Sequence, residues 1–444
     1  MRKILFAMIS CFVALCSHAA QMANLDYIHK LIQQKWDITV PIKADNPMLA
    51  ANMKYLLTAI DVANEILNGE KTTDYGNGEF ATLQAADTVA TNAAVETLIK
   101  KERIEPFCFY DDYGEEAYFT ISASGVFTID CGGVVETITK TNTDTISYQC
   151  PRTVNLNKVC IAGKATGYGD SPAFTMGDCN GGGDRSVYKV SGQLGKIFPT
   201  LADGTQPSFK QAFLGCTIMK EIPDDLFKGI KGQPRSRMFE ETFHMCMSLT
   251  SIPENLFAGI SGAPASYMFY QTFSGCSGLT SIPDGLFAGI SGAPASYMFN
   301  STFSDCYGLT SIPENLFAGI SGAPAIYMFA NTFDGCRGLT SIPAGLFAGI
   351  SGAPAEHMFS RTFYGCRGLT SIPENLFGNI SGTAQSYMFK ETFKNCTSLT
   401  GPSARINGQY LYEIWPSATS VQVSDMYYKA TGLSDYATMP TVWK

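Results

Sequence analysis

The stretch QTFSGCSGLTSIPDGLFAGISGAPASYMFN at 271–300 determines the architecture, because STFSDCYGLTSIPENLFAGISGAPAIYMFA at 301–330 nearly copies it. Six complete 30-residue units run from 211 to 390, and a seventh begins at 391 and diverges after Thr400. A fixed period with atypical end units is typical of a solenoid, in which stacked units share one core.

The boundary between two units carries a helix-like spacing of apolar side chains. Met298, Phe299, Phe303 and Cys306 stand at positions that share one face of an α-helix. We therefore predict a short helix across each boundary, followed by a short extended stretch at LTSI (279–282) that a proline ends. A helix and a strand in every unit predict an α/β solenoid, with the aromatic-rich C-terminal residues as its cap.

Two motifs in the repeats resemble known families. GLTSIPENLFAGI (308–320) resembles the second half of a leucine-rich repeat, and the combination MF..TF.gC.gLTSIP resembles the BspA-like group of bacterial surface proteins. The resemblance covers 206–400, although the unit is longer than the roughly 20–29 residues usual for leucine-rich repeats. It implies an α/β leucine-rich-repeat solenoid that serves surface adhesion and protein binding. The aromatic-rich residues 401–444 are the predicted cap.

Residues 1–20 have the layout of a secretory signal peptide. Arg2 and Lys3 precede the apolar run ILFAMISCFVAL, and small residues then offer a cleavage site. A lipoprotein signal would use Cys16, but Leu15 stands where a small residue is needed. No later stretch is long and apolar enough for a membrane helix. We therefore expect an exported protein without a membrane span, located at the cell surface, in the periplasm or outside the cell.

Two further regions precede the repeats. Residues 21–105 predict helices, because their apolar residues recur at helical spacing. Residues 106–205 predict strands, since residues such as Phe119 and Phe127 alternate with small or polar ones, and TITKTNTDTISYQC predicts two strands around a turn. GVFTIDCGGVVETI (125–138) resembles PKD-like immunoglobulin-type domains, although Asp-Cys-Gly-Gly replaces their WGDG motif. This resemblance implies a small all-β sandwich.

The cysteines form two groups. Seven recur every 30 residues from Cys216 to Cys396, on the apolar face of each unit. Parallel side chains in a column have poor geometry for bridging, and free cysteine packs as a small hydrophobe, so we predict a column of buried thiols. In the β-rich region we expect one or two disulfides, whose connectivity the sequence leaves open, among Cys108, Cys131, Cys150, Cys160 and Cys179.

Composition and motifs argue against several classes of function. The net charge is −8 and no stripe of Lys and Arg occurs, which argues against nucleic-acid binding. No catalytic or metal-binding motif occurs, and His244 and His357 replace other residues at their repeat positions. We therefore expect no enzymatic activity, no cofactor and no metal. A paired-carboxylate hydrolase stays open, because spatial pairs are invisible in a sequence.

Differences between the units indicate a candidate binding surface. LTSIP, LFAGI and SGAPA are almost unchanged over 241–390, whereas four columns vary at offsets i, i+1, i+4 and i+7, one face of the predicted helix. The variable positions are Tyr270, Gln271, Ser274 and Ser277; Asn300, Ser301, Ser304 and Tyr307; Ala330, Asn331, Asp334 and Arg337; and Ser360, Arg361, Tyr364 and Arg367. All of these except Ser277, Ser301, Ala330 and Ser360 form the predicted partner-binding set.

Stacking would join these columns into one surface of Tyr, Arg, Asn and Ser, which suit adaptable recognition. Drift at solvent positions would also have altered Thr280 and Ser281, whose columns are almost constant. We therefore hypothesise that an exported, non-enzymatic protein binds a protein or glycan partner on a host or neighbouring cell through this surface. The alternatives are a structural component of the cell envelope and a secreted hydrolase.

Overall fold

The computed structural model describes residues 106–111, 118–150, 158–176 and 187–444. All of them belong to one compact unit, Ile104–Lys444. The predicted signal peptide at 1–20 and the predicted helical region at 21–105 lie outside the described residues. In the described part of the chain, no helix is long and apolar enough to cross a membrane.

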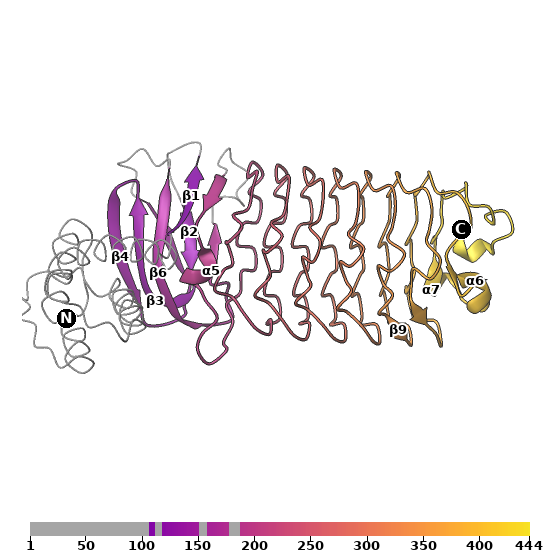
Figure 1. Cartoon of the computed structure of the whole chain (residues 1–444), viewed down its shortest axis with the longest axis horizontal. Coiled ribbons are helices and arrows are strands. Elements are labelled where there is room, and N and C mark those ends of the chain that lie inside the picture. The colour runs from indigo at the N-terminus through magenta and orange to yellow at the C-terminus, as the bar shows by residue number, and fades with distance from the viewer. Residues whose placement is uncertain (1–105, 112–117, 151–157, 177–186) are drawn as a thin grey trace, which may run out of the picture. The chain divides into compact units, whose positions relative to one another are not determined.

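The predicted α/β leucine-rich-repeat class is wrong. Only 5% of the described residues are helical and 20% lie in strands, in small sheets. Residues 211–390, all of which are described, contain turns, isolated parallel bridges and two short strands, β9 (Ser351–Gly352) and β10 (Asn379–Ile380), but no helix. An antiparallel β region therefore leads into a series of coils made of turns (Figure 1).

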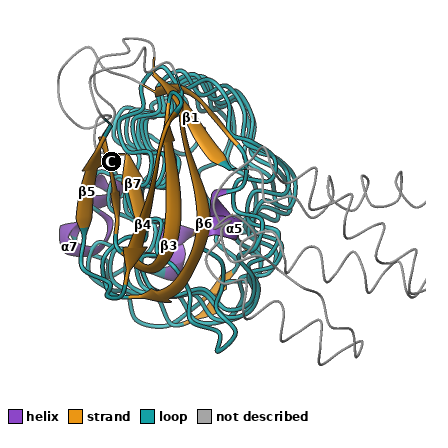
Figure 2. Cartoon of the chain, turned by 90° about the vertical axis from the view of Figure 1, so that its left-hand side faces the viewer, coloured by secondary structure: helices purple, strands orange, loops and turns teal. Residues whose placement is uncertain are grey.

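The β region consists of two antiparallel sheets, which lie in front of the coils in Figure 2. The first has the order β4-β3-β6-β1-β8, with β4 (Val134–Lys140), β3 (Ala123–Cys131), β6 (Val159–Tyr168), β1 (Phe107–Asp111) and β8 (Val187–Ser191). The second has the order β5-β2-β7, with β5 (Ile146–Gln149), β2 (Tyr118–Ile121) and β7 (Phe174–Met176). A short helix, α5 (Leu194–Ile197), follows β8.

Strand alternation and turn chemistry explain the local structure of these sheets. Phe119 and Phe127 have no exposed surface, as their alternation with polar residues predicts. β3 and β4 form a hairpin around Gly132 and Gly133, whose φ angles of 62° and 100° favour glycine. The stretch 137–150 does contain two strands, but β4 pairs with β3 and β5 pairs with β2. The chain therefore changes sheets between β4 and β5.

Two disulfides connect the strands. Cys108–Cys160 joins β1 to the neighbouring β6 within the five-stranded sheet. Cys131–Cys150 joins the end of β3 to the residue after β5, and so links one sheet to the other. The prediction of one or two disulfides in this region is confirmed by these two bonds, which define the connectivity of its four described cysteines. Cys179 lies outside the described residues.

The three-stranded sheet continues directly into the first coil. The backbone N–H groups of Ala173 and Met176 donate to the carbonyl oxygens of Ser208 and Ala212, at 2.7 and 2.9 Å. The Phe213 ring packs against core rings of the sheets, so the buried cluster runs without interruption from the sheets into the coils. The β region thereby covers the apolar edge that the first coil would otherwise expose.

Backbone hydrogen bonds alternate in direction along 297–306, the segment predicted as a helix. Five N–H groups, from Tyr297 to Asp305 at every second residue, donate to carbonyl oxygens of the following coil (326–334) at 2.7–3.0 Å. The residues between them donate to the carbonyl three positions earlier, at 3.2–3.4 Å. Every fourth residue is left-handed, with φ of 59° at Tyr297, 56° at Ser301 and 57° at Asp305. A right-handed helix cannot include such residues, so the segment is a run of four-residue turns.

This four-residue period explains why the sequence resembled a helix. A repeated four-residue turn returns the side chain to the same side every four positions, which is close to the 3.6-residue period of an α-helix. Met298, Phe299, Phe303 and Cys306 accordingly are all fully buried. The spacing therefore identified the buried side chains correctly and the backbone conformation incorrectly.

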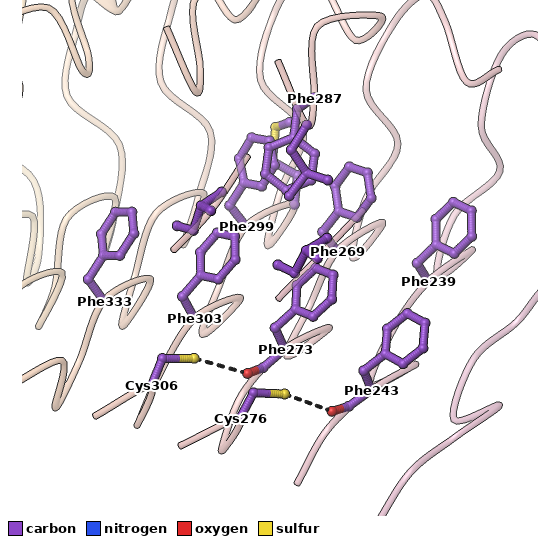
Figure 3. Packing of buried hydrophobic residues seen from close by; sticks show 14 of the residues in the cluster. Phe239, Phe243, Phe269, Phe273, Cys276, Phe287, Phe299, Phe303, Cys306 and Phe333 are labelled. Atoms are coloured by element: carbon purple, nitrogen blue, oxygen red, sulfur yellow. Dashed lines mark hydrogen bonds between the residues drawn. The ribbon is translucent and has the colours of Figure 1, made fainter. Parts of the chain in front are cut away.

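Columns of stacked phenylalanine rings fill the coils (Figure 3). The rings of Phe243, Phe273 and Phe303 follow one another at centroid distances of 5.5 and 5.7 Å and lie within 5° of parallel. Two more columns contain Phe269 and Phe287 with their equivalents in other units. The three columns interlock by tilted contacts, such as the 4.5 Å contact between Phe269 and Phe287. Each unit therefore completes its core only with its neighbours.

The periodic cysteines form a further buried column beside the three columns of rings. Cys306 donates from Sγ to the carbonyl oxygen of Phe273 in the preceding unit at 3.2 Å, and Cys276 makes the same bond one unit earlier (Figure 3). All six cysteines from Cys246 to Cys396 are free and buried. Cys216 is disulfide-bonded, to a partner outside the described residues. The predicted column of packed thiols is confirmed for the six and wrong for Cys216.

The C-terminal residues cover the last unit with short elements. They contain a two-stranded hairpin of β11 (Arg405–Ile406) and β12 (Gln409–Tyr410), two helical turns, α6 (Leu411–Ile414) and α7 (Ser420–Val423), and a 3₁₀ turn, η3 (Thr441–Trp443). Part of this region continues the coil pattern, because Phe389 and Phe393 donate to the carbonyl oxygens of Gln422 and Met426. The Tyr427 ring stacks on Phe393 at 5.8 Å. A diverged additional turn of the coil thus lies within 421–433.

Candidate interaction surface

The predicted surface is only partly exposed. In the first variable column, Asn300, Ala330 and Ser360 are buried, and so is Ser274 in the third. The expectation that all four columns face solvent is therefore wrong. The physical reason is the backbone, since offsets chosen for a helix of 3.6 residues per turn do not share one face in turns of four residues.

Arg361 ties three units together inside this surface. Its guanidinium lies 2.9 Å from an Asp334 carboxylate oxygen in the preceding unit and 2.8 Å from one of Glu391 in the following unit. It also lies 3.8 Å from the centroid of the Tyr364 ring. Lys394 pairs with Glu391 and extends this network. The structure thus brings the predicted residues Asp334, Arg361 and Tyr364 together, and their side chains contact one another.

Burial dominates the electrostatics at Asp334. It raises the pKa of this carboxyl to about 6, although the neighbouring Arg361 acts to lower it. The pKa of Arg361 itself is raised, because attraction to Asp334 and Glu391 outweighs the opposing effect of burial. The carboxylate at this site is therefore one whose charge changes near neutral pH.

The fourth variable column is the accessible part of the predicted surface. Tyr307 is 43% exposed, and Arg337 and Arg367 are exposed in the next two units. The guanidinium of Arg337 lies 4.7 Å from the centroid of the Tyr307 ring. A hydrogen bond with Asp305 raises the pKa of Tyr307. Tyr307, Arg337 and Arg367 thus form a row of polar and aromatic groups open to a partner.

The remaining predicted residues are half-buried, less exposed than the fourth column and less buried than Asn300 and Ser274. This group comprises Tyr270, Gln271, Ser304 and Asn331. Gln271 and Asn331 are left-handed positions with φ of 53° and 54°. These four residues are less exposed than Tyr307, Arg337 and Arg367 of the fourth column.

Structural roles account for several of the constant positions. Thr280 donates from both its backbone N–H and its Oγ1 to the carbonyl oxygen of Thr250, at 3.3 Å in each case. The same pair of bonds recurs at Thr250, Thr310, Thr370 and Thr400, and Thr340 makes the backbone bond. The constancy of this exposed threonine therefore has a structural cause, and its contrast with the variable columns is weaker than the sequence suggested.

A ladder of tyrosines follows the coils beside the variable columns. Tyr267, Tyr297, Tyr327, His357 and Tyr387 stack at successive centroid distances of 4.4, 4.6, 4.1 and 4.6 Å. The imidazole of His357 thus takes the place of a phenol in the stack, as its repeat position predicts. Because the ring faces cover one another, this ladder adds stability more than a binding platform.

Sequence comparison missed two exposed residues of the unit at 241–270. Met245 and Met247 are 37% and 41% exposed, and Met247 belongs to the fourth variable column. The neighbouring His244 is half-buried, burial lowers its pKa, and its Nδ1 has no hydrogen-bond partner. Extending the column comparison one unit towards the N-terminus would have found Met247, because Met stands there where other units have Ser, Tyr or Arg.

Comparison with family models, with curated proteins and with solved structures gave no match. Within the described residues, no group of three His, Cys, Asp or Glu side chains could hold a metal ion. The geometry of the chain itself therefore carries the argument about function.

Proposed function

We propose that the protein is exported and binds a protein or glycan partner on a host or neighbouring cell, through the fourth variable column and its borders. The observation that carries the proposal is the exposed row of Tyr307, Arg337 and Arg367, whose column holds Met, Ser, Tyr or Arg in units that share nearly unchanged LTSIP, LFAGI and SGAPA segments. Exposed Tyr and Arg are the side chains most often decisive in protein recognition.

Two features of the sequence support the same proposal. The repeat motif resembles BspA-like bacterial surface proteins, and residues 1–20 have the layout of a secretory signal peptide. A long row of repeated units also presents many weak contacts side by side, which suits multivalent binding.

A triple substitution tests the proposal. Tyr307, Arg337 and Arg367 are all replaced by Ser, the residue that the column carries naturally at Ser277. The full-length variant should keep its circular dichroism spectrum and melting temperature and lose binding to cells in flow cytometry.

The matched control replaces three exposed acidic residues between the segments LTSIP and LFAGI, Glu254, Asp284 and Glu314, by Ser. This control should bind cells as the wild type does. Cell binding by the correctly folded triple variant at the wild-type level would refute the proposal. Fractionation of the producing cells into periplasm, outer surface and medium tests export separately.

A further inference from the structure

Two arginines of the coils lack the ion pairs that the other arginines make. The described part of the chain contains six arginines, namely Arg235, Arg237, Arg337, Arg361, Arg367 and Arg405. Four of these lie within 4.0 Å of a carboxylate oxygen, and the two that do not are Arg337 and Arg367. Both are exposed, and they stand at the same position of consecutive units.

The spacing of Arg337 and Arg367 along the coils favours an anion. Equivalent residues of adjacent, backbone-paired units lie about 4.8 Å apart, so the like charges of Arg337 and Arg367 repel unless an anion lies against them. Nearby carboxylates have other partners, because Asp334 pairs with Arg361 and Asp305 is hydrogen-bonded to Tyr307. The pair therefore remains uncompensated within the described residues.

The same column becomes apolar towards its N-terminal end. Met247, Ser277, Tyr307, Arg337 and Arg367 follow one another at intervals of 30 residues. Met247 is 41% exposed and Tyr307 43% exposed. We call these five residues the graded column, because its first residue is apolar, its middle residue is aromatic and its last two are cationic.

Met245 adds a second exposed apolar side chain to the unit that carries Met247, although its backbone conformation is unfavourable for methionine. It has a φ of 62°, at a position that holds Gly275, Gly335 and Gly365 in three units and the left-handed residues Asp305 and Asn395 in two others. A left-handed conformation is unfavourable for a residue with a side chain, and Met245 is 37% exposed, so core packing does not demand it. Both methionines thus leave part of their apolar side chains exposed on one unit.

We infer that the graded column binds an extended acidic segment of a partner protein, with an apolar residue against Met247 and carboxylates against Arg337 and Arg367. The inference rests on the proposed function and names the chemistry of the partner. Met, Tyr and Arg are enriched at protein interfaces, and a guanidinium binds a carboxylate through two parallel hydrogen bonds. A linear acidic glycan would satisfy the arginines but would offer no apolar side chain to the methionines.

The length of the graded column sets the size of the segment. Four unit steps of about 4.8 Å give a span of about 19 Å, and an extended chain rises about 3.3 Å per residue. A segment of about six residues therefore reaches from Met247 to Arg367.

Synthetic peptides test this chemistry on the full-length protein. Fluorescence anisotropy is measured with the labelled peptides LLSSSEEE, LLSSSKKK and SSSSSEEE, and with a labelled heparin fragment as the glycan probe. LLSSSEEE should bind, SSSSSEEE should bind more weakly and LLSSSKKK should not bind. Binding of LLSSSEEE should weaken as salt rises, because the exposed charges are screened.

Variants then assign the two ends of the column. The double variant R337Q/R367Q should bind LLSSSEEE at least about tenfold more weakly, since it loses two charge-assisted contacts. The variant M247S should lose affinity for LLSSSEEE but not for SSSSSEEE. The matched control K220Q/K231Q removes the same charge from two exposed lysines elsewhere and should bind as the wild type does.

The outcomes separate this inference from the proposed function. Equal binding of LLSSSEEE by R337Q/R367Q and by the control overturns the inference, as does failure of the wild type to bind this peptide. Heparin binding that depends on the arginine pair, without peptide binding, overturns it in favour of an acidic glycan. If the triple serine variant loses cell binding while no peptide binds, the proposed function stands and the inference falls.

Discussion

At the scale of single residues, positions that hold the same residue in nearly every unit are places where one coil contacts the next. The glycine of LFAGI shows this most directly. A Cβ placed on Gly349 would lie 2.2 Å from the carbonyl oxygen of Ile320 in the preceding unit, whereas a Cβ on Gly345 would meet nothing within 4 Å. One glycine is required by a backbone contact, and the other, four residues away, is not.

Replacing these two glycines tests that contact. We expect Gly349→Ala to lower the free energy of unfolding by about 3 kcal/mol or more, because overpacking forces neighbouring backbones apart. Gly345→Ala should be neutral or slightly stabilising, since it only reduces the freedom of the unfolded chain. Urea denaturation measures both. Equal stabilities of the two variants would contradict the role assigned to Gly349.

The buried thiols should be chemically inert in the folded protein. Burial raises the pKa of the Cys276 thiol to about 12, far above the value of about 8.5 for a free cysteine. Because the thiolate is the reactive form, iodoacetamide at mildly alkaline pH should modify Cys276 only after unfolding. Mass spectrometry of peptides from native and urea-treated protein checks this. Rapid labelling of Cys276 in the native protein would show that the column opens.

Asp334 should make stability depend on pH between about 4 and 6. Its folded-state pKa of about 6 lies above the unfolded value of about 3.9, because burial disfavours the charged form. Ionisation of Asp334 therefore favours unfolding. The stability that the protonated carboxyl contributes to the folded state is fully present below pH 4 and is lost as pH rises through 6. Relative to Asp334→Asn, the wild type should lose about 2–3 kcal/mol of unfolding free energy between pH 4 and pH 7. The exposed control Asp284→Asn should follow the wild type.

At the scale of elements, the sequence revealed which side chains meet but not the backbone that carries them. The positions of Met298, Phe299, Phe303 and Cys306 are equally consistent with a helix and with turns of four residues. What separates the two is the left-handed residue at every fourth position, and Ser301 carries no sequence mark of that conformation. Each such residue is held by a hydrogen bond to the next unit, so the conformation is a property of the stack and not of one unit.

The same reasoning explains how much of the candidate surface was predictable. Variation between units pointed to Arg337 and Arg367, which are exposed, because solvent positions tolerate change. It also pointed to Asn300 and Arg361, which the turns place against neighbouring coils. Only the turn geometry separates contact residues from residues that join the units.

Met245 provides a test of the turns themselves. Its φ of 62° is unfavourable for methionine, so Met245→Gly should raise the free energy of unfolding by about 1 kcal/mol. Met247, two residues away, is not among the left-handed positions, and Met247→Gly should be neutral or destabilising because glycine increases the entropy of the unfolded chain. Chemical denaturation compares the two. Destabilisation by both substitutions to the same extent would argue against a left-handed turn at Met245.

At the scale of the whole molecule, the coils behave as a one-dimensional array whose ends are covered. The β sheets bond to the first coil through Ala173 and Met176, and the diverged coil at 421–433 receives the hydrogen bonds of the last unit. Between these ends the units are joined by similar ladders of backbone bonds, so stability is close to a sum of units and interfaces.

Deleting one whole unit should therefore preserve the fold. Removal of 301–330 brings Tyr297 opposite Glu356, whose carbonyl oxygen already accepts the equivalent bond from Tyr327. We expect cooperative thermal unfolding with a modestly lower melting temperature, because one unit and one interface are lost. Removal of 301–315 takes away the Phe303 ring and the Cys306 thiol without restoring the period, so the ladders on either side fall out of register. This half-unit variant should lose the cooperative transition in circular dichroism melts, and equal behaviour of the two deletions would show that the coils are not held by their 30-residue register.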